Sequence, residues 1–285
     1  MSKGVLRSVI VLTVVLIAGL VAPSSGAARS DRTPLPLVSD RALFAAAERM
    51  TALETPANLG HGARIVFFGD SLGGDVAAGL RPAAAARGAT VVQDTVPGCS
   101  SIDGLLLLAD GSTISWGPTC LNYLNGRWRA KVAATPADAV VWLSSLDGAS
   151  RVVDGVVVDT ATPEGRQRMA ELIIETANII APPGSGRRVV LILPSANAPN
   201  PSLGAPDPAS AVAVRRHRAI QHLVVQSDPS RFSMVRLDQF LCPHGAPCPA
   251  EPVPGITPRG ADGGHLTPEG AAWLAPQLLD ALGVT

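Results

Sequence analysis

The stretch Ile65-Val66-Phe67-Phe68-Gly69-Asp70-Ser71-Leu72 is the starting point for understanding this chain. Its first four residues are apolar and favour a buried strand, and the apolar run breaks at Gly69. A serine that directly follows such a strand can be held exposed at the carboxyl end of the strand. Because Gly, Asp and Ser are also common turn residues, this stretch alone does not separate a nucleophile from an ordinary turn.

A second segment, Asp262-Gly263-Gly264-His265-Leu266-Thr267-Pro268, lies near the end of the chain. It places a carboxylate three residues before an imidazole, just ahead of a predicted helix. If the fold brings Ser71, Asp262 and His265 together, the chain has a nucleophile, an orienting acid and a general base. The chain order Ser, Asp, His is one that hydrolase folds use. The two segments together therefore predict nucleophilic catalysis.

Strands alternate with helices along most of the chain. The predicted strands are 64–68, 89–95, 139–143, 188–193 and 232–237, and the predicted helices are 40–51, 72–87, 121–134, 163–180, 209–226 and 267–282. Such alternation indicates βαβ units and a parallel sheet, hence an α/β fold. Ligands of these sheets bind at the carboxyl ends of the strands, where Ser71, Gly98 and the segment 262–265 are all expected.

The segments Gly69-Asp70-Ser71-Leu72 and Asp262-Gly263-Gly264-His265 resemble the first and last sequence blocks of the SGNH, or GDSL-type, hydrolase superfamily. The resemblance covers residues 64–285. Three further segments are similar to extracytoplasmic SGNH domains attached to, or working beside, bacterial membrane acyltransferases: Leu146-Asp147-Gly148, Val152-Val153-Asp154-Gly155 and Thr162-Pro163-Glu164. The resemblance implies a single-domain, three-layer α/β/α flavodoxin-like fold with a central parallel sheet of about five strands. We assign residues 61–285 to this domain.

The resemblance also implies the roles of the site residues. Ser71 is expected to be the nucleophile, His265 the general base and Asp262 the acid that orients the imidazole. The backbone N–H groups of Ser71 and Gly98 are expected to form the oxyanion hole, although Pro97-Gly98 is also an ordinary turn sequence.

The third sequence block departs from the superfamily pattern. Superfamily members typically carry Gly-x-Asn-Asp after the third strand, whereas this chain has Ser144-Ser145-Leu146-Asp147. Leu146 therefore stands where the asparagine amide would complete the oxyanion hole. Either two donors suffice, or another group such as the Ser145 hydroxyl replaces the amide. Asn197, after the fourth strand, is expected to reach the site from the same sheet edge, and we expect Ser145 and Asn197 to contact the substrate.

The N-terminus has the features of a secretory signal peptide. Lys3 and Arg7 precede an apolar run at 9–21, and Ser25-Gly26-Ala27 supplies small residues for cleavage. An uncleaved anchor is the alternative, but the run is shorter than the roughly 18 to 20 apolar residues that a spanning helix prefers. We expect residues 1–27 to be the signal and 28–60 a linker with one helix, so that the domain is extracytoplasmic.

Four cysteines agree with export to an oxidising compartment. Sequence proximity favours the disulfides Cys99–Cys120 and Cys242–Cys248, although three connectivities are formally possible. The segment 242–248 lacks the second Cys/His pair that a zinc site needs. We therefore expect no metal and no cofactor.

Charge gives no support to a nucleic-acid partner, because 23 basic residues balance 23 acidic ones and no long basic run is present. His217 and His222 lie in an arginine-rich helical stretch, which favours a solvated face. Trp116, Tyr123 and Trp128 either stack on a sugar ring or pack the segment between Cys99 and Cys120.

These observations predict a secreted serine esterase that hydrolyses small acyl esters, in particular acetyl groups on cell-envelope carbohydrate. The expected partners are an acylated small molecule or polysaccharide and a membrane acyltransferase. One alternative is an O-acetyltransferase that takes its acyl group from the membrane partner. Another is a non-catalytic carbohydrate-binding relic, which only the missing asparagine supports.

Overall fold

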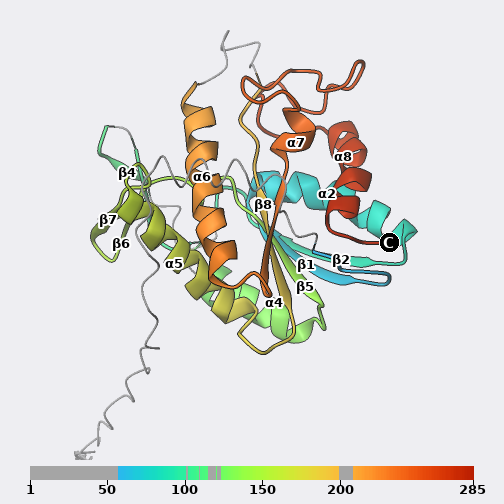
Figure 1. The fold of residues 1–285 in the computed structure, drawn as a ribbon, viewed down its shortest axis with the longest axis horizontal. Helices are drawn as coiled ribbons and strands as arrows, with labels where there is room; N and C mark the ends of the chain where they lie inside the picture. Colours follow the sequence, from blue (N-terminus) through green and yellow to red (C-terminus); the bar gives the residue numbers. More distant parts are fainter. Residues whose placement is uncertain (1–56, 101, 109, 115–119, 121–122, 199–207) are drawn as a thin grey trace, which may run out of the picture. The chain divides into compact units, whose positions relative to one another are not determined.

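A computed structural model describes residues 57–100, 102–108, 110–114, 120, 123–198 and 208–285 (Figure 1). All of them belong to one compact unit, Leu35–Thr285. The expected signal peptide, the expected helix 40–51 and Trp116 lie outside these described residues. Among the helices of the described ranges, none combines the length and the apolar composition that crossing a membrane requires.

Five parallel strands form the central sheet, in the order β2-β1-β5-β8-β9. They are β1 (Arg64–Gly69), β2 (Thr90–Thr95), β5 (Ala139–Leu143), β8 (Arg188–Leu193) and β9 (Phe232–Arg236). Counted along the chain, this is the flavodoxin-like order 2-1-3-4-5. Every residue of β5 and β9 is buried, as expected for parallel strands that are covered on both faces. The α/β fold expected from the sequence is confirmed.

Helices cover both faces of the sheet (Figure 1). One face packs against α2 (Ser71–Ala86) and α8 (Pro268–Ala281), and the other against α4 (Arg129–Ala134), α5 (Pro163–Ile180) and α6 (Pro208–Ser227). Because side chains alternate along a strand, Ile65 and Phe67 join the first core and Val66 and Phe68 the second. The five predicted strands, and the helices α2, α5, α6 and α8, agree with the structure to within one residue at each end.

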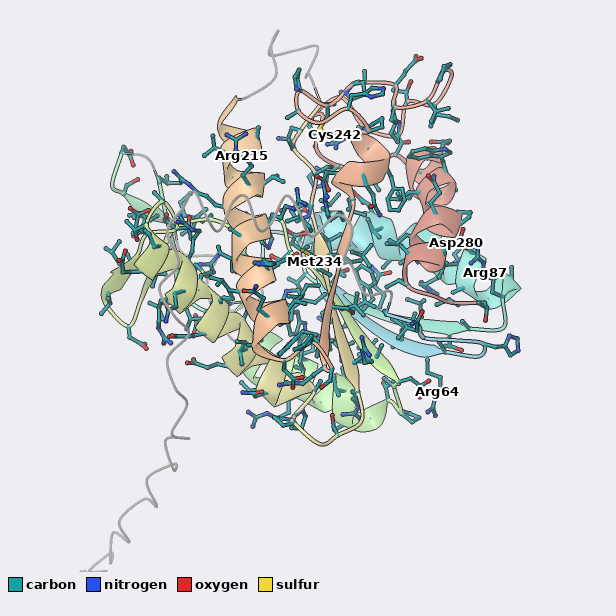
Figure 2. The ribbon with its side chains drawn as sticks, in the orientation of Figure 1. Arg64, Arg87, Arg215, Met234, Cys242 and Asp280 are labelled. Atoms are coloured by element: carbon teal, nitrogen blue, oxygen red, sulfur yellow. A yellow bond between two sulfur atoms is a disulfide. The ribbon has the colours of Figure 1, made fainter. Side chains whose placement is uncertain are left out.

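The pair α2 and α8 is the most extensive helix contact of the described residues. Their far ends are joined on the surface by an ion pair of 2.6 Å between Arg87 Nη1 and Asp280 Oδ1, which lie side by side in Figure 2. A Cβ atom at Gly79 of α2 would lie 2.3 Å from the carbonyl oxygen of Ala271 in α8. The two helices approach this closely only because residue 79 is glycine.

The helices α5 and α8 begin with the same four residues, Thr-Pro-Glu-Gly. In each, the threonine hydroxyl accepts a hydrogen bond from the glycine N–H at 3.0 Å, and proline takes the first helical position. A Cβ atom at Gly165 would lie 1.8 Å from the Asp159 carbonyl oxygen, and one at Gly270 would lie 2.0 Å from that of Pro258. The repeated sequence therefore builds the same cap and the same close backbone contact twice.

A second, smaller sheet was not expected from the sequence. It is antiparallel in the order β4-β3-β6-β7 and consists of β3 (Leu105–Leu107), β4 (Thr113–Ile114), β6 (Arg151–Val153) and β7 (Val156–Val158). Asp154 and Gly155 join β6 to β7 with φ angles of 52° and 77°, as a tight hairpin turn requires. The predicted helix 121–134 is a π-helical segment η2 (Tyr123–Trp128) followed by α4 in its described part, and a short α7 (Asp238–Leu241) follows β9.

Candidate active site

The turn that carries Ser71, residues 69–72, is closed tightly against β5. A Cβ atom at Gly69 would lie 2.0 Å from the carbonyl oxygen of Leu143, and one at Gly73 would lie 2.8 Å from the same oxygen. Only glycine fits at either position. Ser71 follows as the first residue of α2, at the carboxyl end of β1 and beside the switch point of the sheet, where ligands of this topology bind. We call residues 69–72 the serine turn.

Asp70 points away from solvent and links the serine turn to the segment after β5. It is 1 % exposed and caps α2 by accepting a hydrogen bond from the Gly73 N–H at 3.2 Å. Its other oxygen accepts from the Ser145 N–H at 2.7 Å and from the Ser145 hydroxyl at 2.5 Å. Burial raises the pKa of Asp70, and these hydrogen bonds oppose that rise because they favour the carboxylate.

Ser71, His265 and Asp262 form a continuous chain of hydrogen bonds. His265 Nε2 lies 2.8 Å from Ser71 Oγ, and His265 Nδ1 lies 2.5 Å from Asp262 Oδ2. Asp262 Oδ1 accepts from the backbone N–H groups of Gly264 and His265, both at 3.0 Å. The side chains of His265 and Asp262 are half-exposed, so the serine hydroxyl and its base are open to a ligand. This arrangement has the geometry that acyl transfer requires of a nucleophile, a base and an orienting acid.

The pKa values of the two partners move apart. The hydrogen bond to Asp262 raises the pKa of His265 above 6.5, and the negative charges of Asp262, Asp75 and Asp70 add to this rise. The same hydrogen bond lowers the pKa of Asp262. The raised His265 pKa stabilises the fold fully below pH 6.5, and this contribution is lost as the pH rises through the raised value. Because a general base must be neutral, activity should instead rise with pH over that interval.

The segment that carries Asp262 and His265, residues 259–267, is held by a buried arginine. We call it the Asp/His loop. Arg259 donates to the Gly263 carbonyl oxygen at 2.6 Å and to the Ser195 hydroxyl. Gly263 has a φ of 71°, and its carbonyl oxygen also accepts from the Ala198 N–H at 2.9 Å. Burial lowers the pKa of Arg259 to about 10, which leaves the guanidinium charged at neutral pH. The loop is thereby tied to the segment that follows β8.

Asp75, which the sequence analysis did not single out, ties the Asp/His loop to the helix of Ser71. Its Oδ2 accepts a hydrogen bond from the Leu266 N–H at 3.1 Å. Asp75 stands four residues after Ser71 in α2, so the two side chains share one face of the helix. Burial raises the pKa of Asp75. A carboxylate four residues after the candidate serine was the signal that could have found it.

Residues 42–280 match the family described as SGNH domain (fused to AT3 domains). The chain belongs to this SGNH family. The chain matches no curated protein sequence.

Several solved structures resemble this SGNH protein at low sequence identity. The periplasmic domain of the lipopolysaccharide acetyltransferase of Salmonella ser. Paratyphi A is 15% identical, with 87% of this chain and 98% of that chain covered and a TM-score of 0.49. The lipase/acylhydrolase of Enterococcus faecalis is 18% identical, with coverages of 78% and 95% and a TM-score of 0.43. The acetylxylan esterase of Geobacillus stearothermophilus, a catalytic mutant, is 15% identical, with coverages of 80% and 97% and a TM-score of 0.44.

The third block of this SGNH domain is held by a buried network. The Asp147 carboxylate accepts from the Ser100 hydroxyl at 2.6 Å and from Trp142 Nε1 at 2.9 Å. Arg151, 1 % exposed, donates to Ser100 Oγ at 2.7 Å and to the Leu146 carbonyl oxygen at 2.6 Å. The network fixes the chain at Leu146 and Asp147. In this arrangement the Ser145 hydroxyl donates its proton to Asp70, so it does not replace the missing amide.

The two remaining site candidates follow the carboxyl ends of their strands, Gly98 after β2 and Asn197 after β8. Gly98 follows β2 in a turn with a φ of 73°, a backbone conformation that favours glycine. Asn197 is exposed and lies against the Asp/His loop, since its Oδ1 is 3.3 Å from where a Cβ atom at Gly264 would be. Asn197 therefore lies beside the loop that carries the base. Its predicted role in substrate binding stays a prediction.

The structure contains both disulfides that sequence proximity favours. Cys99 joins Cys120, and Cys242 joins Cys248, so no described cysteine is free. Within the described part of the chain, no group of three or more His, Cys, Asp or Glu side chains is placed to hold a metal ion.

The prediction of a solvated face at His217 and His222 was wrong. Both are nearly inaccessible, at 2 % and 3 % exposure, because α6 turns them toward the protein interior. Burial lowers the pKa of His217 to about 4, and its Nε2 lies 3.1 Å from Gln221 Nε2. A Cβ atom at Gly148 would lie 2.5 Å from the His217 Cβ, so this histidine packs under the third block. His217 is a buried neutral packing residue.

Trp128 is fully buried and therefore packs the protein rather than a sugar. Its ring stacks on Phe68 of β1 with a centroid distance of 4.2 Å and meets the edge of Trp142 at 5.7 Å. These aromatic contacts anchor the end of η2 on the central sheet.

Proposed function

We propose that this SGNH protein is a serine esterase that hydrolyses small acyl esters, specifically acetyl esters on carbohydrate of the cell envelope. The observation that carries the proposal is the hydrogen-bonded chain Asp262–His265–Ser71, with distances of 2.5 Å and 2.8 Å. Membership of the SGNH family supports the same class of chemistry. The two disulfides favour an oxidising compartment, which agrees with the secretory signal expected at residues 1–27.

In this mechanism Ser71 Oγ attacks the ester carbonyl while His265 Nε2 accepts the hydroxyl proton. Asp262 holds the proton on Nδ1 and stabilises the imidazolium that forms. The negative oxygen of the tetrahedral intermediate is bound by the N–H groups of Ser71 and Gly98, each worth about 3 kcal/mol in comparable sites. His265 then protonates the leaving alcohol, which leaves an acyl group on Ser71. Water, activated by the same imidazole, releases the acid and restores the serine.

A second candidate function is acyl transfer to a sugar hydroxyl. The family match names SGNH domains that are fused to AT3 domains, so a membrane acyltransferase is a candidate donor of the acyl group. The chemistry at Ser71, His265 and Asp262 is the same, except that a sugar alcohol replaces water in the second half. Leu146, in place of the usual asparagine, would leave two backbone donors for the oxyanion.

Hydrolysis of p-nitrophenyl acetate by the purified protein tests the proposal. We expect Ser71→Ala to abolish the activity and Ser185→Ala, in an exposed turn before β8, to leave it unchanged. Addition of an acceptor sugar to the same assay separates transfer from hydrolysis, because transfer yields an acetylated sugar. Activity that survives in Ser71→Ala would overturn the proposal. An inactive wild-type protein that still binds carbohydrate would favour the non-catalytic relic.

A further inference from the structure

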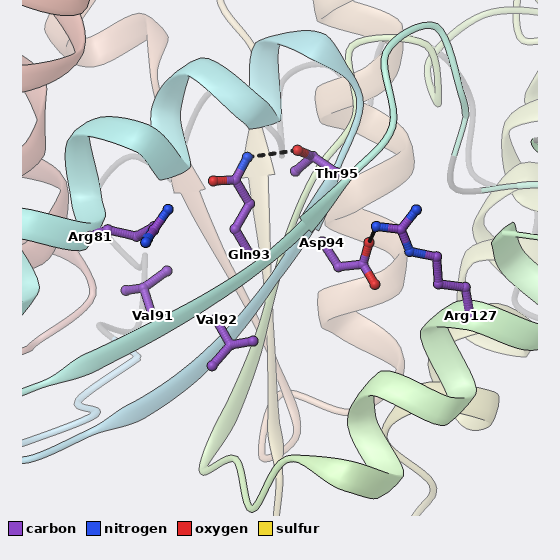
Figure 3. A pocket seen from close by; sticks show the side chains of 7 residues that line it. All are labelled: Arg81, Val91, Val92, Gln93, Asp94, Thr95 and Arg127. Carbon is purple, nitrogen blue, oxygen red and sulfur yellow. Dashed lines mark hydrogen bonds and ion pairs between the residues drawn. The ribbon is translucent and has the colours of Figure 1, made fainter.

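A pocket lies along the free edge of the central sheet. The edge strand is β2, which pairs only with β1 among the described strands. The side chains that line the pocket come from β2, from α2 and from η2 (Figure 3): Arg81, Val91, Val92, Gln93, Asp94, Thr95 and Arg127. None of these residues has a role in the mechanism above.

The pocket is lined from both faces of the edge strand. Gln93 and Thr95 lie on the α2 face, where Gln93 Nε2 donates to Thr95 Oγ1 at 2.8 Å. Asp94 points to the other face and forms an ion pair of 2.7 Å with Arg127 (Figure 3). The pocket therefore presents amide, hydroxyl and guanidinium groups around one strand edge. Such groups hydrogen-bond well to the hydroxyls of a sugar chain.

One end of the pocket lies beside the serine turn. Thr95 of β2 pairs in register with Gly69 of β1, and Gly69 lies two residues before Ser71. Thr95 Oγ1 is also 3.3 Å from where a Cβ atom at Gly74 would be, in the first turn of α2. Arg81 stands ten residues after Ser71 in the same helix, which corresponds to about 15 Å along the helix axis. The pocket thus leads from the first turn of α2 along the edge of the sheet.

The lining of the pocket carries a positive charge. It contains two guanidinium groups, of Arg81 and Arg127, and one carboxylate, of Asp94, which is an excess of one positive charge. Asp94 is fully buried and fixes Arg127, whose side chain is still 60% exposed. Arg81 is exposed and forms no ion pair with any described residue. A guanidinium with this freedom is well suited to a carboxylate, which it can bind through two parallel hydrogen bonds.

We infer that the β2-edge pocket is a binding subsite for an acidic, uronate-bearing glycan whose acetyl ester is presented to Ser71. The inference rests on the proposed function and specifies its substrate class. The uronate carboxylate binds Arg81, and sugar hydroxyls bind Gln93, Thr95 and the exposed part of Arg127. The subsite holds the glycan chain against the sheet edge, so that its contribution is to binding and orientation of the ester.

Kinetics with two acetylated substrates test the inference. The probes are O-acetylated oligogalacturonide, which is acidic, and acetylated xylooligosaccharide, which is neutral. We expect Arg81→Ala to lower the ratio of kcat/KM for the acidic over the neutral substrate about fivefold at low salt, mainly through KM. Added salt should reduce this ratio in the wild type, because it screens a partly exposed charge. Arg168→Ala, on the surface of α5, is the matched control and should leave the ratio unchanged.

A binding measurement separates failure of the subsite from failure of the proposed esterase. Calorimetric titration of de-acetylated oligogalacturonide into Ser71→Ala protein requires no activity, and binding should weaken about fivefold in the Arg81→Ala double variant. The subsite would be overturned if the protein is an active esterase but Arg81→Ala changes neither the ratio of kcat/KM values for the two substrates nor the affinity for oligogalacturonide. Arg81-dependent binding by a protein without esterase activity would support the subsite and overturn the proposed hydrolysis. Binding of a peptide along β2 without any binding of oligogalacturonide would also overturn the inference.

Discussion

The serine turn and the Asp/His loop are held in different ways. The serine turn is enclosed by the backbone, since a single added carbon at Gly69 would meet the Leu143 carbonyl oxygen at 2.0 Å. The Asp/His loop is half-exposed and is held by side chains, namely Arg259 from one side and Asp75 from the other. The position of the nucleophile therefore depends on packing, whereas the position and pKa of the base depend on a few hydrogen bonds and charges.

Within the Asp/His loop, the largest expected effect comes from removing the acid itself. Asp262→Asn should lower kcat/KM for p-nitrophenyl acetate by about 10³-fold to 10⁴-fold, because an amide favours the wrong imidazole tautomer. Steady-state kinetics measure the effect, and circular dichroism checks the fold. Asp228→Asn, at the turn before β9, is the control and should keep full activity. Wild-type rates in Asp262→Asn would show that this carboxylate does not orient His265.

A substitution in the serine turn should lower the unfolding free energy of the protein rather than impair the chemical step directly. Gly69→Ala places a carbon inside the contact radius of a backbone oxygen, so the sheet must shift, at a cost of about 2 to 4 kcal/mol of unfolding free energy. Urea denaturation measures this change. Gly126→Ala, where nothing lies within 4 Å of the added carbon, is the control and should unfold like the wild type. Equal unfolding midpoints for Gly69→Ala and the wild type would contradict the packing argument.

The Asp/His loop should instead lose activity when its buried arginine is removed. Arg259→Met keeps the bulk of the side chain but loses the hydrogen bonds to Gly263 and Ser195, so the loop should shift and kcat/KM should fall about tenfold to a hundredfold. Activity per folded molecule, with the folded fraction taken from thermal unfolding, is the measurement. Arg259→Lys should recover part of the loss. If Arg259→Met only lowered the unfolding temperature, the arginine would be a stability residue without a positioning role.

The smallest expected effect is a shift of the pH profile. Asp75→Asn keeps an oxygen that can accept from the Leu266 N–H but removes a negative charge near His265. The pKa of His265 should therefore fall, and the acidic limb of kcat/KM should move to lower pH by less than about one unit. NMR titration of His265 gives the same quantity without an activity assay. Glu171→Gln, on α5, is the control, and a pKa of His265 that is unchanged or higher in Asp75→Asn would refute the electrostatic role.

The central sheet was predictable because each of its strands is a continuous apolar run bounded by polar or turn residues. The serine and the Asp/His segments were predictable because Gly69 and the sequence before Pro268 mark element ends. The small sheet was missed because its strands have only two or three residues, although Asp154-Gly155 between valines is a hairpin signal.

Contacts between distant segments were harder to predict. Nothing in the local sequence shows that Arg259 reaches Ser195, which lies 64 residues earlier. His217 looked solvated because its neighbours are arginines, and only the orientation of α6 on the sheet makes it buried. Asp75, in contrast, could have been predicted to lie near Ser71, because residues four apart in a helix are neighbours on its surface.

The Cys99–Cys120 disulfide closes the segment between the two cysteines into a covalent loop. The two Cα atoms are 5.4 Å apart across a separation of 21 residues, so the chain leaves and re-enters the protein at nearly one point. The strands β3 and β4 belong to this loop, whereas the other two strands of the small sheet, β6 and β7, do not. An insertion at the exposed turn between β3 and β4 should therefore leave the path of the chain from β2 to η2 unchanged, whereas Ser100 in the same loop must stay because it holds the third block.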